Sequence, residues 1–268
     1  MAVTKGRRVA ASGARFDRHA YYERAVQDPE TDAAMLAKLF RRYRTRLPTR
    51  LREDFCGTAT LSAHWVRGQA GRTATAVDLD GPTLEWGRRH HLEGIESKVQ
   101  LIQGNVLDGE GPKADISCAM NFSYSIFKTR SALLRYFEVA RTTLVKDGVF
   151  VIDTWGGWGA IRPECERKKI GEFYYEWDQV RFDPLTNEIL CQIHFELPGG
   201  IRIDRAFTYD WRLWSVQELR ELLLEAGFSK VHALWERTDE DGDDTGVFFE
   251  PRRVNNQEKW WTFIVAER

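Results

Sequence analysis

The amino-acid sequence predicts an α/β protein with a doubly wound, mostly parallel β-sheet and a later insertion of antiparallel strands. Two observations predict this fold class. Between residues 50 and 154, short apolar segments typical of strands alternate with helical patterns, as in parallel sheets with crossover helices on both faces. Between residues 171 and 211, alternating segments rich in aromatic residues are separated by turn signals, which indicates antiparallel strands.

A helix is predicted near the N-terminus. Asp28 is suited to cap it and Pro29 to its first position, and an apolar face continues until Pro48 ends the pattern. Residues 1–52 contain 13 Lys and Arg against 5 Asp and Glu, but the arginines lie mostly off the apolar face. We interpret them as a solvated helix surface rather than a nucleic-acid stripe. Residues 1–15, which include no acidic residue, are interpreted as a solvated tail.

The core pattern contains five strands and three helices. The strands are predicted at Arg50–Phe55, Thr73–Asp78, Lys98–Gly104, Asp115–Met120 and Gly148–Thr154. The helices between them are predicted at Thr60–Arg67, Thr83–Leu92 and Ser131–Leu144. After three inserted strands, a capping box of Ser215 and Glu218 opens another helix, which Gly227 ends. Two strands then close the chain, at Lys230–Glu236 and Lys259–Glu267.

The composition excludes several classes of protein. The 268-residue chain has 43% apolar residues, 29% charged residues and a formal net charge of −1, so no overall field draws it onto nucleic acid or an anionic membrane. No apolar run approaches the ~18 residues of a membrane span. The cysteines are far apart and the histidines show no metal spacing. We therefore expect reduced thiols in a cytoplasmic protein, and no metal site.

Three polar features fall at the carboxyl ends of consecutive predicted strands, where parallel α/β sheets bind ligands. The stretch EDFCGTA, residues 53–59, runs from the first strand into a small-residue turn and a helix. Asp78 ends the second strand, where its carboxylate can accept hydrogen bonds from both hydroxyls of a ribose. Asn105 follows the third strand, where an adenine edge would lie. Together these features predict an adenosine pocket.

Over residues 50–154 the sequence resembles the class I S-adenosylmethionine-dependent methyltransferases. REDFCGTATLS resembles the first motif of that family, with Glu53 at the acidic position and Gly57 as the central glycine. AVDLD resembles the second motif, with Asp78 as the ribose-binding acid, and QGNVLD resembles the third, with Asn105 in place of an aspartate. The resemblance implies a Rossmann-like, seven-stranded sheet and S-adenosyl-L-methionine as the cofactor.

Two positions depart from the family's first motif. Glycines are typical where this sequence has Phe55 and Ala59, because glycine tolerates φ > 0 and lets a ligand approach the backbone closely. The departure implies an altered grip on the cofactor, or none. The loop also lacks the G-x-G-x-x-G pattern of a pyrophosphate cradle, which disfavours a dinucleotide.

The resemblance implies a set of cofactor-binding residues that lie in the first-motif strand and turn, at the end of the second strand and in the loops that follow the next two strands, together with one tyrosine near the N-terminus. They are Tyr22, Arg52, Glu53, Phe55, Cys56, Gly57, Thr58, Asp78, Leu79, Asn105, Val106, Asn121 and Phe122. For two of these residues, two different roles stay open. Tyr22, with Tyr21, covers the cofactor as a lid or fastens its segment to the core. Arg52 meets the cofactor carboxylate or lies on the protein surface.

The chain is expected to have four parts. Residues 1–49 form the tail and a lid helix, and residues 50–160 form the cofactor-binding core. Residues 161–212 form the antiparallel insertion, which covers the acceptor or makes a dimer contact. Residues 213–268 add a helix and the last two strands of the core sheet.

The implied reaction is transfer of a methyl group to a small-molecule acceptor, with nitrogen slightly favoured over oxygen. The aromatic insertion suits a closed apolar pocket, and it is similar to that of family members that methylate small amines, including amino acids and amino sugars. A hydroxyl or carboxylate near the amine need only favour its neutral form or receive its proton. The candidates for this role are Tyr124, Asp153 and Tyr209.

Two alternative functions stay open. An RNA methyltransferase is suggested by the basic composition of residues 1–52. A catalytically inactive relative, which binds the cofactor or a partner, is suggested by Phe55 and Ala59 in the first motif.

Overall fold

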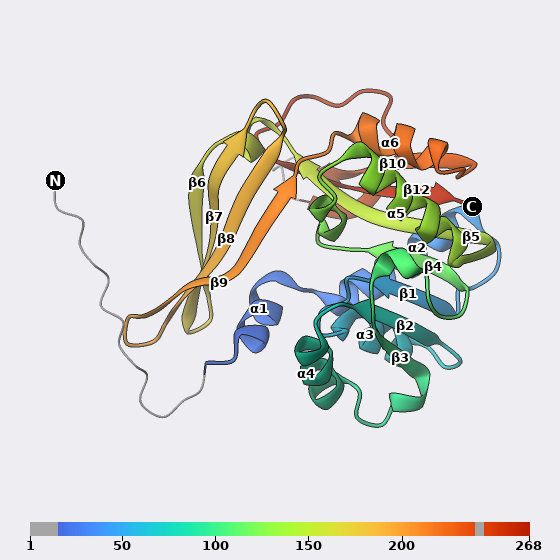
Figure 1. Ribbon diagram of the computed structural model, residues 1–268, viewed down its shortest axis with the longest axis horizontal. Coiled ribbons are helices and arrows are strands. Elements are labelled where there is room, and N and C mark those ends of the chain that lie inside the picture. The colour runs from blue at the N-terminus through green and yellow to red at the C-terminus, as the bar shows by residue number, and fades with distance from the viewer. Residues whose placement is uncertain (1–15, 239–243) are drawn as a thin grey trace.

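The computed structural model describes residues 16–238 and 244–268, and at its centre is an eight-stranded sheet (Figure 1). The strand order is β11-β10-β12-β5-β4-β1-β2-β3. The bounds are β1 Arg50–Asp54, β2 Thr73–Asp78, β3 Val99–Gln103, β4 Ala114–Ala119, β5 Leu144–Gly156, β10 Lys230–Thr238, β11 Asp244–Phe249 and β12 Trp260–Glu267. Strands β1 to β5 pair in parallel, whereas β12 is antiparallel to β5 and β10. The order reverses between β1 and β4, so a ligand crevice is expected at their carboxyl ends.

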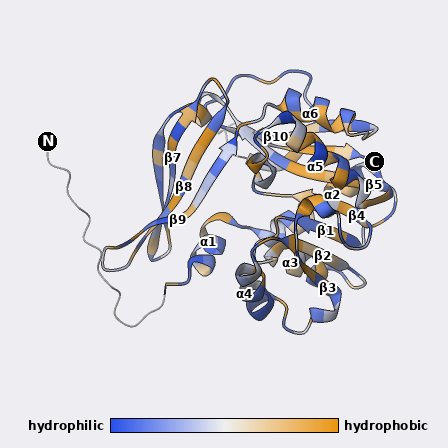
Figure 2. Cartoon of the chain, viewed as in Figure 1, coloured by the Kyte–Doolittle hydropathy of each residue, from blue (hydrophilic) through white to orange (hydrophobic). Residues whose placement is uncertain are grey.

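The described residues form six α-helices, and five of them cover the two faces of this sheet. They are α1 Arg18–Val26, α2 Pro29–Tyr43, α3 Thr60–Gly68, α4 Gly81–His91, α5 Arg130–Thr142 and α6 Val216–Glu225, with short 3-10 turns η1 Glu96–Lys98, η2 Val106–Asp108, η3 Ser123–Ile126 and η4 Trp158–Ile161. The apolar sides of α2, α3 and α4 pack on one face, and those of α5 and α6 pack on the other. Figure 2 shows hydrophobic residues along the central strand β4, whereas α4 is largely hydrophilic. The predicted α/β fold is confirmed.

A second, four-stranded antiparallel sheet stands beside the first (Figure 1). Its strands are β6 Glu164–Ile170, β7 Phe173–Asp183, β8 Glu188–Leu197 and β9 Ile201–Arg212, paired in that order. Aromatic residues of β7, β8 and β9 pack against α1. Others pack against Phe122 and Trp155, which follow β4 and lie near the end of β5. The second sheet therefore covers the carboxyl-end edge of the core.

The sequence prediction missed three elements. Strand β6 is an edge strand of charged, mostly exposed residues, without the alternation that marks a half-buried strand. Strand β11 pairs with β10, so the sheet has eight strands where seven were expected. Helix α1 has no buried residue and no clear apolar face of its own. The tail predicted at residues 1–15 lies outside the described residues.

The loop after β1 keeps a glycine-type backbone at two positions that are not glycine. Phe55, Gly57 and Ala59 have φ of 58°, 54° and 56°, all in the left-handed region. When every second residue has a left-handed φ, successive backbone groups point toward one side of the loop. The Phe55 ring packs on Phe127 and Tyr136, with ring centroids 6.1 and 5.5 Å away. The substitutions in the motif therefore preserve its backbone and add side-chain contacts.

We expect Ala59→Gly to leave the free energy of unfolding unchanged or to raise it by up to about 1 kcal/mol, because it relieves left-handed strain. Ala63→Gly is the matched control, since Ala63 is equally buried but lies within α3. There a glycine should cost about 1 kcal/mol. Urea denaturation of both variants checks the difference, and equal losses would contradict the assigned strain.

Candidate active site

A cavity of about 470 Å³ lies beyond the carboxyl ends of β1 and β2, where the core meets α1 and β9. Gly57 and Asp78 line it from the core, Tyr22 from α1 and Tyr209 from β9. A recess of about 100 Å³ shares several of these lining residues and extends to Glu53. Small-molecule sites have volumes of about 300–1,000 Å³. The cavity therefore has room for a nucleoside-sized ligand.

Asp78 ends β2 and holds two backbone segments at this cavity. One carboxylate oxygen accepts a hydrogen bond from the Gly57 N–H at 2.8 Å, and the other accepts one from the Asp80 N–H at 2.9 Å. A carboxylate has about four acceptor positions, so two remain for a ligand. Leu79, the next residue, is 66% exposed.

Glu53 lies beneath the loop and is buried. Its Oε2 accepts hydrogen bonds from the backbone N–H of Ser62 at 3.0 Å and from the Ser62 hydroxyl at 2.6 Å, which ties β1 to α3. Burial raises the pKa of Glu53 to about 8, against the opposing effect of these hydrogen bonds. Glu53 is thus largely protonated at neutral pH.

This raised pKa predicts a pH dependence of stability. Between the ordinary glutamate pKa of about 4.5 and about 8, the folded state binds a proton that the unfolded state has lost. The free energy of unfolding should therefore fall as the pH rises through this window, by about 1 kcal/mol per pH unit. Glu53→Gln should lose most of the slope above pH 6. Urea denaturation from pH 5 to 8 checks this, and an unchanged slope in the variant would refute it.

Arg52 is neither on the surface nor at the cofactor cavity. It is fully buried, its Nε donates to Asp54 Oδ1 at 2.8 Å, and its Nη1 donates to the Glu110 carbonyl. Asp54 also accepts a hydrogen bond from the Tyr136 hydroxyl at 3.0 Å. Both alternatives considered for Arg52 are therefore replaced by a buried ion pair under the α5 side of the sheet.

Thr58 and Cys56 complete the loop. The Thr58 hydroxyl donates to Glu23 of α1 at 2.5 Å, and the same Glu23 oxygen lies 2.7 Å from Nε2 of His91 in α4. These contacts fasten α1 across the loop. Cys56 is buried, its N–H donates to the Val77 carbonyl at 3.0 Å, and burial raises the pKa of its thiol. Cys56 therefore supports the loop through its backbone and is not a reactive thiolate.

The two adjacent tyrosines of α1 have different surroundings. Tyr21 packs on Phe173 and Phe195 of the second sheet, with ring centroids 4.8 and 5.9 Å away. Tyr22 lines the cavity together with Tyr209 of β9. Tyr21 thus fastens α1 to the second sheet, while Tyr22 faces the cavity.

The segment after β3 is placed at the edge of the site. Asn105 is exposed, and its side-chain oxygen accepts a hydrogen bond from the Leu107 N–H at 3.0 Å, which caps η2. Val106 is buried beneath it. Neither residue lines the cavity as described. To reach a base, the side chain of Asn105 would have to give up its capping hydrogen bond to Leu107. Its backbone would not have to move.

The loop after β4 is held by Asp153 near the end of β5. Asn121 and Phe122 have φ of 56° and 57°, and their N–H groups donate to the two Asp153 oxygens at 3.0 Å each. The Trp261 indole donates to the same carboxylate at 3.3 Å. Burial raises the pKa of Asp153 to about 6. With both oxygens engaged and 3% exposure, Asp153 positions this loop rather than contacting an acceptor.

The other two catalytic candidates, Tyr124 and Tyr209, have different surroundings. Tyr124 is 1% exposed, packs on Phe137 and hydrogen-bonds Thr154, and it lines neither the cavity nor the recess. Its position favours a role in packing. Tyr209 lines both, so it alone of the three candidates reaches the cavity.

Residues of α1 and its C-cap that sequence reasoning missed also line the cavity. They are Arg18, His19 and Gln27. The Gln27 Oε1 atom is buried and has no hydrogen-bond partner among the described residues. Such an acceptor costs free energy unless a ligand or water satisfies it. No motif marks Gln27, because its position depends on how α1 packs on the second sheet.

Two further observations bear on the site. Among the residues that the structure describes, no group of three or more His, Cys, Asp or Glu side chains is arranged to hold a metal ion. In the same ranges, no helix has the length and apolarity required to cross a membrane.

Comparison of the sequence with known proteins gives partial matches. No family model matches the chain. The ribosomal RNA large subunit methyltransferase K/L of Pseudomonas aeruginosa is 32% identical over 123 residues, which is 40% of this chain and 17% of that protein. The chain thus corresponds to a small part of this relative.

Comparison of the structure gives matches over nearly the whole chain. An amino pentose methyltransferase of calicheamicin biosynthesis from Micromonospora echinaspora, solved with bound S-adenosylmethionine, has a TM-score of 0.67 at 14% identity, covering 97% of this chain and 100% of its own. A sugar N-methyltransferase from Streptoalloteichus has a TM-score of 0.65 at 18% identity, covering 100% and 98%. The chain therefore shares the fold of these S-adenosylmethionine-dependent methyltransferases, a Rossmann-like, mostly parallel sheet with an antiparallel insertion.

Proposed function

We propose that this chain is a methyltransferase that uses S-adenosylmethionine to methylate a nitrogen of a small molecule. The observation that supports this most directly is the joint placement of Asp78 and the left-handed loop of Phe55, Gly57 and Ala59 at one cavity. Either feature alone occurs in many α/β proteins. Their hydrogen-bonded combination at the β1–β2 edge suits a nucleoside with free ribose hydroxyls.

The residues present fit this cofactor. Asp78 would accept the ribose hydroxyls, and the base would lie beside the exposed Leu79 and the backbone of Asn105. The recess at Glu53 would take the amino-acid end, where the unpartnered Gln27 oxygen can accept from an ammonium group. When bound, the cofactor supplies an activated methyl group and a good leaving group, so the protein's contribution is placement and desolvation.

Tyr22 and Tyr209 are the residues that we propose to orient the acceptor. Both line the cavity, and burial raises the pKa of both. They therefore stay protonated at neutral pH and act as hydrogen-bonding groups rather than phenolate bases. Such a pair can hold an amine with its lone pair directed at the methyl carbon.

Nitrogen is favoured as the acceptor atom by the two structural neighbours named above, one an amino pentose and one a sugar N-methyltransferase. The test is to incubate the protein with S-adenosylmethionine and pooled metabolites and to measure S-adenosylhomocysteine by mass spectrometry. Release that requires one amine-containing pool is expected. Cofactor binding without release in any pool would instead identify a catalytically inactive relative.

RNA methylation is a second candidate, favoured by the partial sequence match to ribosomal RNA methyltransferases. The near-neutral net charge weighs against it, because RNA binding relies on an excess of positive charge. Transfer of a labelled methyl group to total RNA at 200 mM salt is the test. Incorporation into RNA, with none into the metabolite pools, would replace the first proposal.

A further inference from the structure

Strand β9 runs along the cavity from an exposed end to an inner end. Arg205 and Tyr209 of this strand both line the cavity, but only Tyr209 also lines the recess that extends to Glu53. Arg205 is exposed, whereas Tyr209 is half-buried. Four residues of extended strand separate the two, which is at most about 13 Å. Arg205 therefore marks the outer end of the cavity, and Tyr209 marks the end where methyl transfer is proposed.

The backbone of β9 is irregular at Arg205. Its φ is 53°, in the left-handed region that favours glycine. The pairing of β9 with β8 shifts between Ile193 and Phe195, and the Arg205 N–H donates to Nδ1 of the buried His194 at 3.0 Å. Bulges often redirect a side chain beside an active site, and backbone strain concentrates at functional positions. The strand thus leaves regular pairing at the one arginine that it places at the cavity.

The guanidinium of Arg205 supplies a positive charge without a counter-ion. It makes no hydrogen bond and no ion pair with any group in residues 16–238 and 244–268. The other arginine of the cavity, Arg18, lies 3.8 Å from Asp80. Burial lowers the pKa of His19, which also lines the cavity, so this ring is largely neutral at pH 7. At the outer end, Arg205 is therefore available to an anionic group of a ligand.

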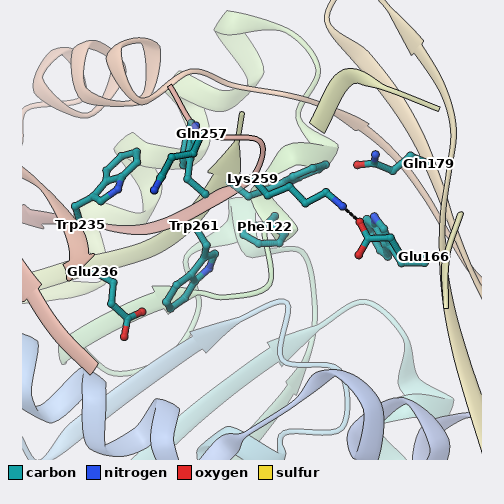
Figure 3. A pocket seen from close by; sticks show the side chains of 11 residues that line it. Phe122, Glu166, Gln179, Trp235, Glu236, Gln257, Lys259 and Trp261 are labelled. Carbon is teal, nitrogen blue, oxygen red and sulfur yellow. Dashed lines mark ion pairs between the residues drawn. The ribbon is translucent and has the colours of Figure 1, made fainter. Parts of the chain in front are cut away.

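Aromatic rings close the opposite approach to Tyr209. A second cavity, of about 540 Å³, has Phe122 and Trp177 in its wall (Figure 3). The ring centroid of Phe122 is 6.3 Å from that of Trp211, and the ring centroid of Trp177 is 5.9 Å from that of Tyr209. These rings stand between the two cavities. An acceptor held at Tyr209 therefore has room to continue along β9 toward Arg205.

We propose that the methyl acceptor is an amine that also carries an anionic group, a carboxylate or a phosphate, and that Arg205 binds this group; the proposal rests on the proposed function. A guanidinium can donate two parallel hydrogen bonds to either anion. The length of β9 between Arg205 and Tyr209 requires several bonds between the amine and the anion, more than an α-amino acid has. Arg205 is thus a specificity-determining residue that sets how far the acceptor enters the cavity.

The test compares three amines of the same chain length on the protein saturated with S-adenosylhomocysteine. They are 6-aminohexanoate, 6-aminohexyl phosphate and the neutral 6-aminohexan-1-ol. Calorimetry on the wild-type protein should show at least one of the two anionic amines binding at least fivefold more tightly than the alcohol. The anion that binds more tightly identifies the group that the site prefers.

Arg205→Gly should reduce this preference to less than twofold. The same variant relieves the left-handed strain, so its midpoint of urea denaturation should stay the same or rise, and lost binding cannot then be attributed to unfolding. Arg202→Met is the matched control. Arg202 is on the same strand, pairs with Glu176 and Asp204 and does not line the cavity, so its removal should leave the preference unchanged.

Four results would overturn the assignment of Arg205. They are equal binding of the three amines, binding of none of them, a preference that survives in Arg205→Gly, and a preference lost equally in Arg202→Met. In each case the proposed methyltransferase function stands if S-adenosylhomocysteine binds to the wild-type protein. If S-adenosylhomocysteine does not bind, the proposed function fails, whatever the three amines do.

Discussion

Asp78→Ala is expected to weaken S-adenosylmethionine binding by roughly a hundredfold or more. Two charge-assisted hydrogen bonds from ribose hydroxyls would be lost, each worth about 1.5–3 kcal/mol. The variant also frees the Gly57 N–H, which Asp78 holds at 2.8 Å, so the loop loses an anchor. Calorimetric titration of the wild type and the variant measures both effects in one dissociation constant.

Asp80→Ala provides the matched control for this change. Asp80 is a carboxylate two residues further along, where it caps α4 through the Thr83 N–H and pairs with Arg18. Its removal takes away the same charge from the same rim without touching the ribose position. We expect a loss of affinity below about fivefold, as for one exposed ion pair. Equal losses in the two variants would show that net charge matters and that the ribose assignment is mistaken.

Asp54→Ala should be the most destabilising single change, at about 3–5 kcal/mol, because it leaves the Arg52 guanidinium buried without a counter-ion. Arg52 is 0% and Asp54 1% exposed. The Nη2 atom of Arg52 already has no partner among the described residues, so no spare acceptor stands nearby. Burial raises the pKa of Asp54, opposed by Arg52 and by the Tyr136 hydroxyl.

Two companion variants separate the charge from the packing. Tyr136→Phe removes only one hydrogen bond to Asp54 and should cost about 1 kcal/mol. The double replacement Arg52→Leu with Asp54→Leu removes both charges and should recover most of the loss, since apolar residues often replace buried ion pairs without penalty. Urea denaturation measures all of these. A double variant as unstable as Asp54→Ala would contradict an origin in the unpaired charge.

Local sequence signals were sufficient for the core. β2 runs from Thr73 to Asp78 as predicted, and the capping box of Ser215 and Glu218 opens α6, because these elements depend on propensity, caps and alternation near in sequence. The same holds for Asp78 at the cavity edge, since a strand end and a motif locate it. Even the non-glycine residues Phe55 and Ala59 keep the motif's backbone.

Tertiary contacts decided what the sequence could not predict. Alternation in β1 puts Arg52 and Asp54 on one strand face, but nothing local indicates that this face is buried in the fold. Gln27 enters the cavity only because α1 packs between two sheets. Asp153 was a candidate for proton transfer because it lies near the end of a core strand, yet both its oxygens hold the loop after β4. A cavity of about 540 Å³ likewise combines residues from five strands, β5, β6, β7, β10 and β12.

The most direct test of the central claim is a crystal structure of the protein with S-adenosylhomocysteine. The proposed function predicts that the ribose hydroxyls lie on the Asp78 carboxylate, that the base lies beside Leu79 and Asn105, and that the amino-acid end lies in the recess near Gln27. A cavity closed by the Phe55 ring, or a ligand bound with its ribose away from Asp78, would contradict it.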